Sequence, residues 1–131
     1  MFTIHKTDTG AVAPWEYLPA VEGTYKIGSF LRNSGGLLTA EADMGEATKY
    51  LCMAEKTVAE GELIPVVRVN TDMILKSEWS NELMEGLVVV GAVGKVSSDG
   101  AAVSSDGMDI AVEIVAMDGT NPGDTVYVRL Q

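Results

Sequence analysis

The last quarter of the chain contains two short segments in which apolar and polar residues alternate. In MDIAVEIVAMDG the apolar set is Ile110, Val112 and Ile114, and in DTVYVRLQ it is Val126, Val128 and Leu130. Side chains of a strand point to opposite faces in turn, whereas a helix needs apolar residues three or four positions apart. Both segments therefore predict β-strands with one buried face.

Similar runs of five to eight residues recur along the chain, and 14 glycines punctuate them. GELIPVVRVN and TDMILKSEWS predict strands, and Pro65 places the first at a sheet edge or a bulge because proline cannot donate to a ladder. The continuous apolar run LVVVGAV predicts a buried strand. GTYKIGSFLR and LLTA flank Asn33 to Gly36, which predicts a hairpin. The pattern indicates an all-β fold, either a small β-barrel or a sandwich.

Two segments leave room for a helix. Residues 40–60 are rich in Ala, Glu, Lys and Met, which favours helix, but Thr48 to Met53 contains β-branched and aromatic residues. We favour a strand there. SNELMEG, with Ser80 as a cap, is compatible with one helical turn. We therefore expect at most one short helix.

The first 22 residues have little periodicity of either kind. Pro14 and Pro19 surround Trp15, Tyr17 and Leu18, and a residue before proline is biased toward extended backbone. We expect an extended N-terminal arm at residues 1–22 and a single β domain at residues 23–131. The three apolar residues of the arm either bind a partner or cover the core of the domain itself.

The net charge is −10, from 19 acidic and 9 basic residues. Nucleic acid and anionic membrane are therefore expected not to be partners, because both require clustered Lys and Arg. The start of the chain has no basic segment followed by an apolar run, so we expect no secretory signal. The longest apolar stretch is too short to span a bilayer.

The tetrapeptide SSDG occurs twice, at residues 97–100 and 104–107. The aspartates do not have EF-hand spacing, and the neighbouring GAVGKVSS lacks the glycine and hydroxyl positions of a phosphate loop. Asp and Gly are favoured in tight turns, so we interpret both copies as turns. His5 is the only histidine and Cys52 the only cysteine, which leaves no ligand set of these types. We expect no metal and no cofactor.

Trp79 has two interpretations, a lid on the core or a surface contact for a sugar or a protein. The acidic residues show no spacing that singles out a catalytic pair. We therefore expect no enzymatic activity, and a glycosidase-like pair of acids is the least favoured alternative.

Three segments resemble small structural proteins from the head-gene region of tailed phages and prophages of Gram-positive bacteria. The segments are EYLPAVEGTYKIGSFL, TKYLCMAEKTVAEGELIPVVRVNTDMI and GDTVYVRL. The features that carry the resemblance are Glu16 to Pro19, Gly23 before a Tyr-containing strand, Lys49-Tyr50, Gly61-Glu62 before Ile64-Pro65-Val66, and Gly123-Asp124. Lys95 to Met108 is the part that matches least.

The resemblance implies a compact β domain that decorates or cements the capsid shell and has no catalytic residues. The implied partner is the major capsid protein or another head protein, and the implied assembly is a homo-oligomer, with a trimer favoured. The implied location is the virion head, or the bacterial cytoplasm when a prophage expresses the protein. Trp15, Tyr17, Leu18 and Trp79 are the candidate partner contacts. The alternative is a carbohydrate-binding β module that stacks sugars on Trp15 or Trp79.

Overall fold

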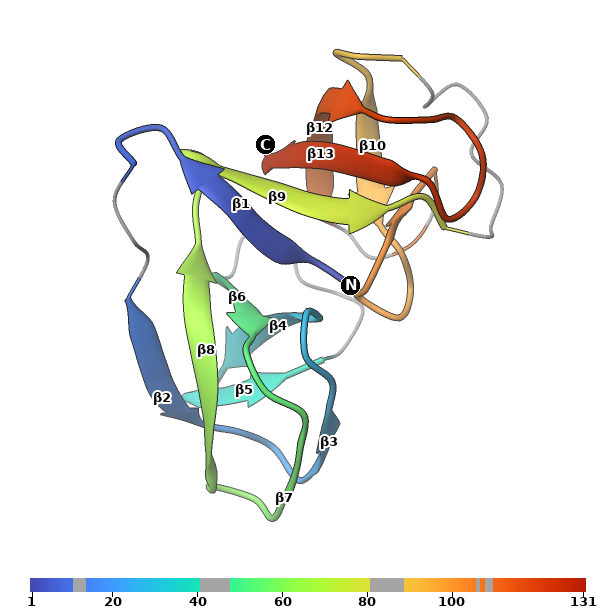
Figure 1. Cartoon of the computed structure of the whole chain (residues 1–131). Helices are drawn as coiled ribbons and strands as arrows, with labels where there is room; N and C mark the ends of the chain where they lie inside the picture. Colours follow the sequence, from blue (N-terminus) through green and yellow to red (C-terminus); the bar gives the residue numbers. More distant parts are fainter. Residues whose placement is uncertain (11–13, 41–47, 81–88, 106, 108–109) are drawn as a thin grey trace.

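The computed structural model describes residues 1–10, 14–40, 48–80, 89–105, 107 and 110–131. Every regular element in this part of the chain is a β-strand, which confirms the all-β prediction. The strands form three antiparallel sheets, and none of them closes into a barrel (Figure 1). The two larger sheets pack as a small sandwich. Residues 41–47 and 81–86, where a helix had been weighed, lie outside the described residues.

Sheet A has six strands. In spatial order they are β1 (Thr3–Thr7), β9 (Met73–Glu78), β13 (Thr125–Leu130), β12 (Ala111–Met117), β10 (Val93–Val96) and β11 (Val103–Ser104). The two alternating segments near the C-terminus are β12 and β13, and they pair with each other as neighbours. Val112, Ile114, Val126 and Val128 are buried, as the alternation predicts.

Sheet B has five strands and sheet C has two. Sheet B contains, in spatial order, β2 (Trp15–Pro19), β8 (Leu63–Val69), β6 (Lys49–Cys52), β4 (Phe30–Ser34) and β5 (Leu37–Thr39). Sheet C consists of β3 (Gly23–Tyr25) and β7 (Lys56–Val58). A single parallel bridge between Ala20 and Leu38 brings the two edges of sheet B together at one end.

Sheet B is buried on both faces, and two cores result. The first core lies between sheets A and B and contains Phe30, Leu51, Val67, Leu75 and Val128 among others. The second lies between sheets B and C and contains Leu31, Leu38, Tyr50, Ile64 and Val58 among others. Adjacent residues of one strand thus enter different cores, because successive side chains of a strand point to opposite faces.

Strand β8 shows this division most clearly. Val67 and Val69 enter the first core, whereas Ile64 and Val66 enter the second. A strand with water on one face would need polar residues at every second position. The near-continuous apolar sequence of β8 is the consequence of its having a core on each side.

The prediction that Pro65 marks an edge or a bulge is corrected. β8 pairs with β2 on one side and with β6 on the other, without a bulge. The β6 ladder ends at the pair Cys52 and Val66, and the carbonyl of Pro65 then accepts a hydrogen bond from the amide of Met53 (3.0 Å). The nitrogen of Pro65 faces the same side of β8 as its carbonyl. The N–H group that proline lacks is therefore missing just beyond the last residue pair of the β6 ladder.

The hairpin predicted around NSGG is confirmed. Ser34 pairs with Leu37, and Gly35 and Gly36 form the two-residue connection with φ of 62° and 94°. Positive φ at both central positions is the requirement of a type I′ turn, and glycine meets it without steric cost. Asn33 adds a side-chain oxygen that accepts from the amide of Gly36 (3.0 Å).

The buried strand predicted for LVVVGAV is wrong in the described part. Val89 and Val90 are 58% and 64% exposed and lie in no strand. The chain turns at Gly91, whose φ is 91°, and β10 begins only at Val93. The residues of β10 that face the first core lie further along the chain than Val89 and Val90, and Val96 is one of them.

The described parts of residues 1–22 contribute one strand to each of the two large sheets. β1 pairs with β9, and β2 pairs with β8. Phe2 is buried in the first core, where its ring meets Phe30 edge to face with centroids 4.8 Å apart. The amide of Phe2 donates to the carbonyl of Gly28 (2.8 Å).

Gly28 provides a test of this close approach. Its φ is 77°, and a Cβ there would lie 2.8 Å from the carbonyl oxygen of Phe2. We expect Gly28→Ala to lower the free energy of unfolding by about 2–4 kcal/mol, because backbone strain and the clash add. Gly61 has a similar φ of 86° but open space around it. Gly61→Ala is the control and should cost only about 1–2 kcal/mol in urea denaturation; equal losses would contradict the argument.

Candidate binding surface

The candidate contact residues of β2 do not share one face. Trp15 and Tyr17 are 54% and 62% exposed, and they lie two positions apart on the same side of the strand. Leu18 points to the other side and packs against the second core. The structure therefore brings Trp15 and Tyr17 together and assigns Leu18 to the domain's own packing.

Strand β8 adds a residue that the sequence reasoning missed. Tyr17 is directly opposite Pro65, and Pro19 is opposite Leu63, which is 50% exposed. Trp15 is opposite Val67, a residue of the first core. Residues directly opposite one another share a face, so these side chains continue the face of sheet B that sheet A covers elsewhere. The sequence could have indicated this residue, because Leu63 lies two positions before Pro65 and four before Val67. In a strand these three side chains point to the same face.

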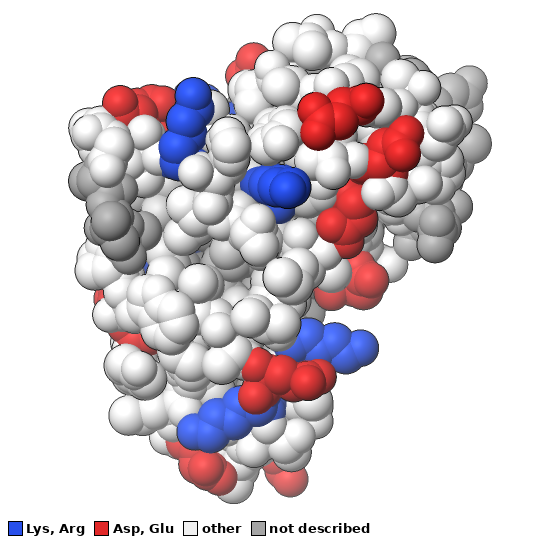
Figure 2. All heavy atoms as spheres, viewed as in Figure 1, with Lys and Arg blue, Asp and Glu red and all other residues white. Residues whose placement is uncertain are grey.

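The β2–β8 face is the group formed by the exposed residues Trp15, Tyr17 and Leu63 together with the partly buried Pro19. Lys56 borders it, because its Nζ donates to the carbonyl of Leu63 (3.0 Å). Figure 2 shows acidic side chains along the right-hand side of the molecule, at its upper left and at its lower end. On a chain with a net charge of −10, an exposed group of two aromatic residues and a leucine is a distinct feature.

Charged groups lie on the opposite side of the same two strands. Arg68 Nη2 lies 3.6 Å from Glu16 Oε1 and donates to the hydroxyl of Tyr50 (3.4 Å). The guanidinium carbon of Arg68 is 5.7 Å from the centre of the Tyr50 ring, within the range of a cation–π contact. Arg68 thus holds Glu16 beside the sheet, away from the aromatic side chains.

Trp79 is a core residue and not a surface contact. Its side chain is 1% exposed and belongs to the first core. Its indole nitrogen donates to the carbonyl of Gly119 (2.9 Å). This hydrogen bond satisfies the indole N–H, which is the one polar group of a tryptophan side chain. In this position the ring has no face available for a sugar or a partner protein.

The outer face of sheet A carries two shallow hollows. One, of about 250 Å³, is lined by His5, Lys6, Ile74, Val115, Ala116 and Tyr127. The register of β1 shifts at His5 and that of β12 shifts at Val115, so two β-bulges place these side chains at the same hollow. The rings of His5 and Tyr127 lie 4.8 Å apart. The second, of about 340 Å³, is lined by Met1, Thr3, Lys76, Ser77, Glu78, Gly123 and Thr125.

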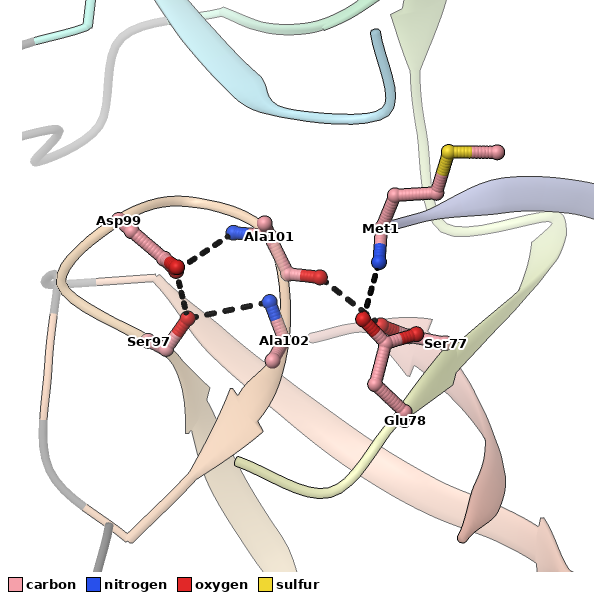
Figure 3. Close-up of polar contacts among 7 residues, drawn as sticks. All are labelled: Met1, Ser77, Glu78, Ser97, Asp99, Ala101 and Ala102. Atoms are coloured by element: carbon pink, nitrogen blue, oxygen red, sulfur yellow. Dashed lines mark hydrogen bonds and ion pairs between the residues drawn. The ribbon is translucent and has the colours of Figure 1, made fainter. Parts of the chain in front are cut away.

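The first SSDG is a turn, as predicted, and it belongs to a hairpin. It joins β10 to β11, with Val96 paired to Val103. The Asp99 carboxylate accepts hydrogen bonds from the hydroxyl of Ser97 and from the amide of Ala101 (Figure 3). The Ser97 hydroxyl in turn accepts from the amide of Ala102 (3.0 Å). Asp106 of the second SSDG lies outside the described residues.

The same turn connects the two large sheets. The carbonyl of Gly100 accepts from the amide of Phe30 in β4 (3.1 Å), and the carbonyl of Ala101 accepts from the hydroxyl of Ser77 in β9 (3.3 Å). Next to Ser77, Glu78 binds the amino group of Met1 (Figure 3). This turn therefore fastens sheet A to sheet B.

The ionisable groups of the described residues show no arrangement typical of metal binding. Within residues 1–10, 14–40, 48–80, 89–105, 107 and 110–131, no three His, Cys, Asp or Glu side chains gather closely enough to hold an ion. Burial raises the pKa of the Cys52 thiol, which donates to the carbonyl of Ala54 (3.1 Å). Cys52 is thus a small buried residue, as predicted. The described chain has no helix with the length and apolarity needed to cross a bilayer.

Comparison with known proteins gives no match, either to a family model or to a curated relative. The resemblance to phage head proteins therefore stays a prediction.

The two tryptophans allow a matched test of core and surface. We expect Trp79→Ala to lower the free energy of unfolding by about 3–5 kcal/mol, because it empties a core position. Trp15→Ala should lower it by only about 1–2 kcal/mol, because about half of the side chain is already exposed. Urea denaturation followed by circular dichroism measures both values. A loss of several kcal/mol in Trp15→Ala would show that Trp15 is a core residue.

The Ser97–Asp99 contact predicts a pH dependence. The hydrogen bond from Ser97 lowers the pKa of Asp99 below its ordinary value, and the bond from the Ala101 amide acts in the same direction. The carboxylate therefore stabilises the fold above about pH 4, and this contribution is lost as the pH falls through the lower pKa of the folded state. In Asp99→Asn this part of the acid dependence should disappear. In Ser97→Ala, NMR titration should show the pKa of Asp99 moving up; an unchanged pKa would rule out the assigned cause.

Proposed function

We propose that the protein is a non-enzymatic structural protein of a phage or prophage head, which decorates or stabilises the capsid shell by docking its β2–β8 face on a shell protein. The observation that carries this proposal is the exposure of Trp15, Tyr17 and Leu63 on one face of sheet B. Rigid aromatic side chains are enriched at protein interfaces because they supply large contact areas at little entropic cost.

Two further observations support the proposal. The segments that resemble phage head proteins include residues 16–19 of β2 and the whole of β8, so the resemblance covers the exposed face apart from Trp15. Glu16, the acidic residue between the two aromatic residues, points to the reverse side of the sheet toward Arg68, so docking on the aromatic side does not require its carboxylate to lose water.

A carbohydrate-binding module is the second candidate. Trp15 and Tyr17 are two exposed rings on one side of one strand, about 7 Å apart along the strand, and such rings can stack on sugars. Trp79 does not contribute, because it is buried. A glycan array should show ligands that are lost in Trp15→Ala if this candidate is correct. An array without ligands would exclude it for the glycans that the array carries.

Co-sedimentation with the cognate heads tests the first candidate. We expect purified protein to bind the shell, and Trp15→Ala and Tyr17→Ala each to weaken binding at least about tenfold, as interface anchors do.

Tyr127→Ala is the matched control, because Tyr127 is an aromatic residue on the outer face of sheet A. It should bind the heads as the unchanged protein does. Absence of the protein from virions and from sedimented heads would overturn the proposal. A loss in Tyr127→Ala comparable to that in Trp15→Ala would move the docking surface to sheet A.

A further inference from the structure

The large sheets have four edge strands, and β2 differs from the other three. β5 and β11 are only three and two residues long. β1 has five residues, but its register shifts at His5 and Lys6 lies on the edge. Short length, bulges and lysine are the usual devices that protect an edge from pairing. β2 has five residues in continuous register with β8, and two of them are exposed aromatic residues.

The direction of the backbone groups of β2 follows from its printed neighbours. The amide of Ala20 donates to Glu62, and the carbonyl of Ala20 accepts from Gly61, so both groups of Ala20 face the β8 side. Backbone groups alternate along a strand. The groups of Trp15, Tyr17 and Pro19 therefore face outward. The backbone groups of Val21 also face outward, and its amide donates a hydrogen bond to the carbonyl of Leu38.

The outward groups near the end of β2 are used by the bridge between Ala20 and Leu38. Further back, the described chain places no strand beside Trp15 and Tyr17, because β2 is the last strand of its sheet (Figure 1). Two N–H groups and two C=O groups thus point away from the molecule. They form one short segment that is ready to accept a strand.

We propose that this segment pairs with the same segment of a second copy of the chain. In the antiparallel arrangement centred on Glu16, Trp15 of each copy lies opposite Tyr17 of the other. Each such pair is of the hydrogen-bonded type, so all four outward groups of each copy find a partner. The two five-stranded sheets become one sheet of ten strands, with a twofold axis at Glu16.

Self-complementarity is the reason for choosing a second copy as the partner. The sequence Trp15-Glu16-Tyr17, read against itself, gives two aromatic cross-strand pairs on one face, and such pairs stabilise antiparallel strands. The cost is that Glu16 faces Glu16. Arg68 lies 3.6 Å from each Glu16 and offsets part of the repulsion. An interface of this kind is isologous, as twofold axes require.

The small area of the proposed interface indicates that the dimer is weak. Trp15 and Tyr17 are about half exposed, which corresponds to roughly 250 Å² of side-chain surface per copy, and pairing buries only part of it. A standard interface uses about 800 Å² per partner. We therefore expect a reversible, concentration-dependent dimer with a Kd of about 10–1,000 µM. Pairing leaves the β2–β8 faces of the copies side by side, so it does not compete with docking on a shell and does not depend on that function.

Sedimentation equilibrium over a range of protein concentrations tests the pair. Tyr17→Pro removes the outward N–H without touching the ladder to β8, and Pro19 shows that β2 accepts proline at this parity. We expect Tyr17→Pro to weaken dimerisation at least about tenfold. Tyr17→Phe keeps the backbone donor and the ring, and should dimerise as the unchanged chain does.

A change in the opposite direction makes the register testable. Glu16→Gln removes the facing charges and should tighten the dimer about threefold to tenfold. Added salt should tighten the unchanged dimer by screening the same repulsion, and should have a smaller effect on Glu16→Gln, in which only the repulsion between the net charges of the two copies remains. Glu60→Gln, an exposed charge in the turn before β8, is the control and should leave dimerisation unchanged.

The outcomes separate this proposal from docking on a shell, because no shell is present. A chain that is monomeric at all concentrations overturns it, and so does a dimer that is insensitive to both Tyr17→Pro and Glu16→Gln. If Tyr17→Pro does not fold, Trp15→Lys takes its place and should weaken the dimer to a similar extent. Binding to heads without self-association would leave the proposed function standing and reject the β2 pair.

Discussion

The architecture depends on sheet B having an apolar layer on each side. Because Val67 and Ile64 of the same strand enter different cores, neither face of this sheet can be given polar residues without emptying a core. Sheets A and C are each held by one of these faces. A change in register of β8 by one residue would exchange the two sets of side chains and disturb both cores at once.

The candidate surface is a by-product of this layering. Sheet A covers only part of the inner face of sheet B, and Trp15, Tyr17 and Leu63 continue that face into solvent. The same apolar character that builds the first core thus produces an exposed aromatic surface where the cover ends. Arg68 and Glu16, on the reverse side, mark the limit of the second core.

Local patterns predicted local structure well. The alternation in residues 109–131 and the paired glycines after Ser34 depend only on side-chain direction and on φ, and both predictions are confirmed. Pro65 and LVVVGAV were misjudged because their roles depend on where a neighbouring strand stops and on which positions face the core. Those facts arise from tertiary packing.

The candidate site was predicted in part. Two aromatic residues between prolines suggested a contact, but parity separated Leu18 from Trp15 and Tyr17 only once β2 had a partner strand. The burial of Trp79 depends on Gly119, 40 residues away. The role of the first SSDG at the seam of the sheets depends on Phe30 and Ser77, and no local pattern connects them.

The order of strands in sheet A has a mechanical consequence. β1 and β13 both pair antiparallel with β9, so they run in the same direction, and the two chain termini lie toward opposite ends of these strands (Figure 1). A force that separates the termini acts along the strands and loads the hydrogen bonds of both ladders together, in shear. The ladders cannot open one bond at a time, so β1, β9 and β13 form a clamp that resists stretching between the two ends.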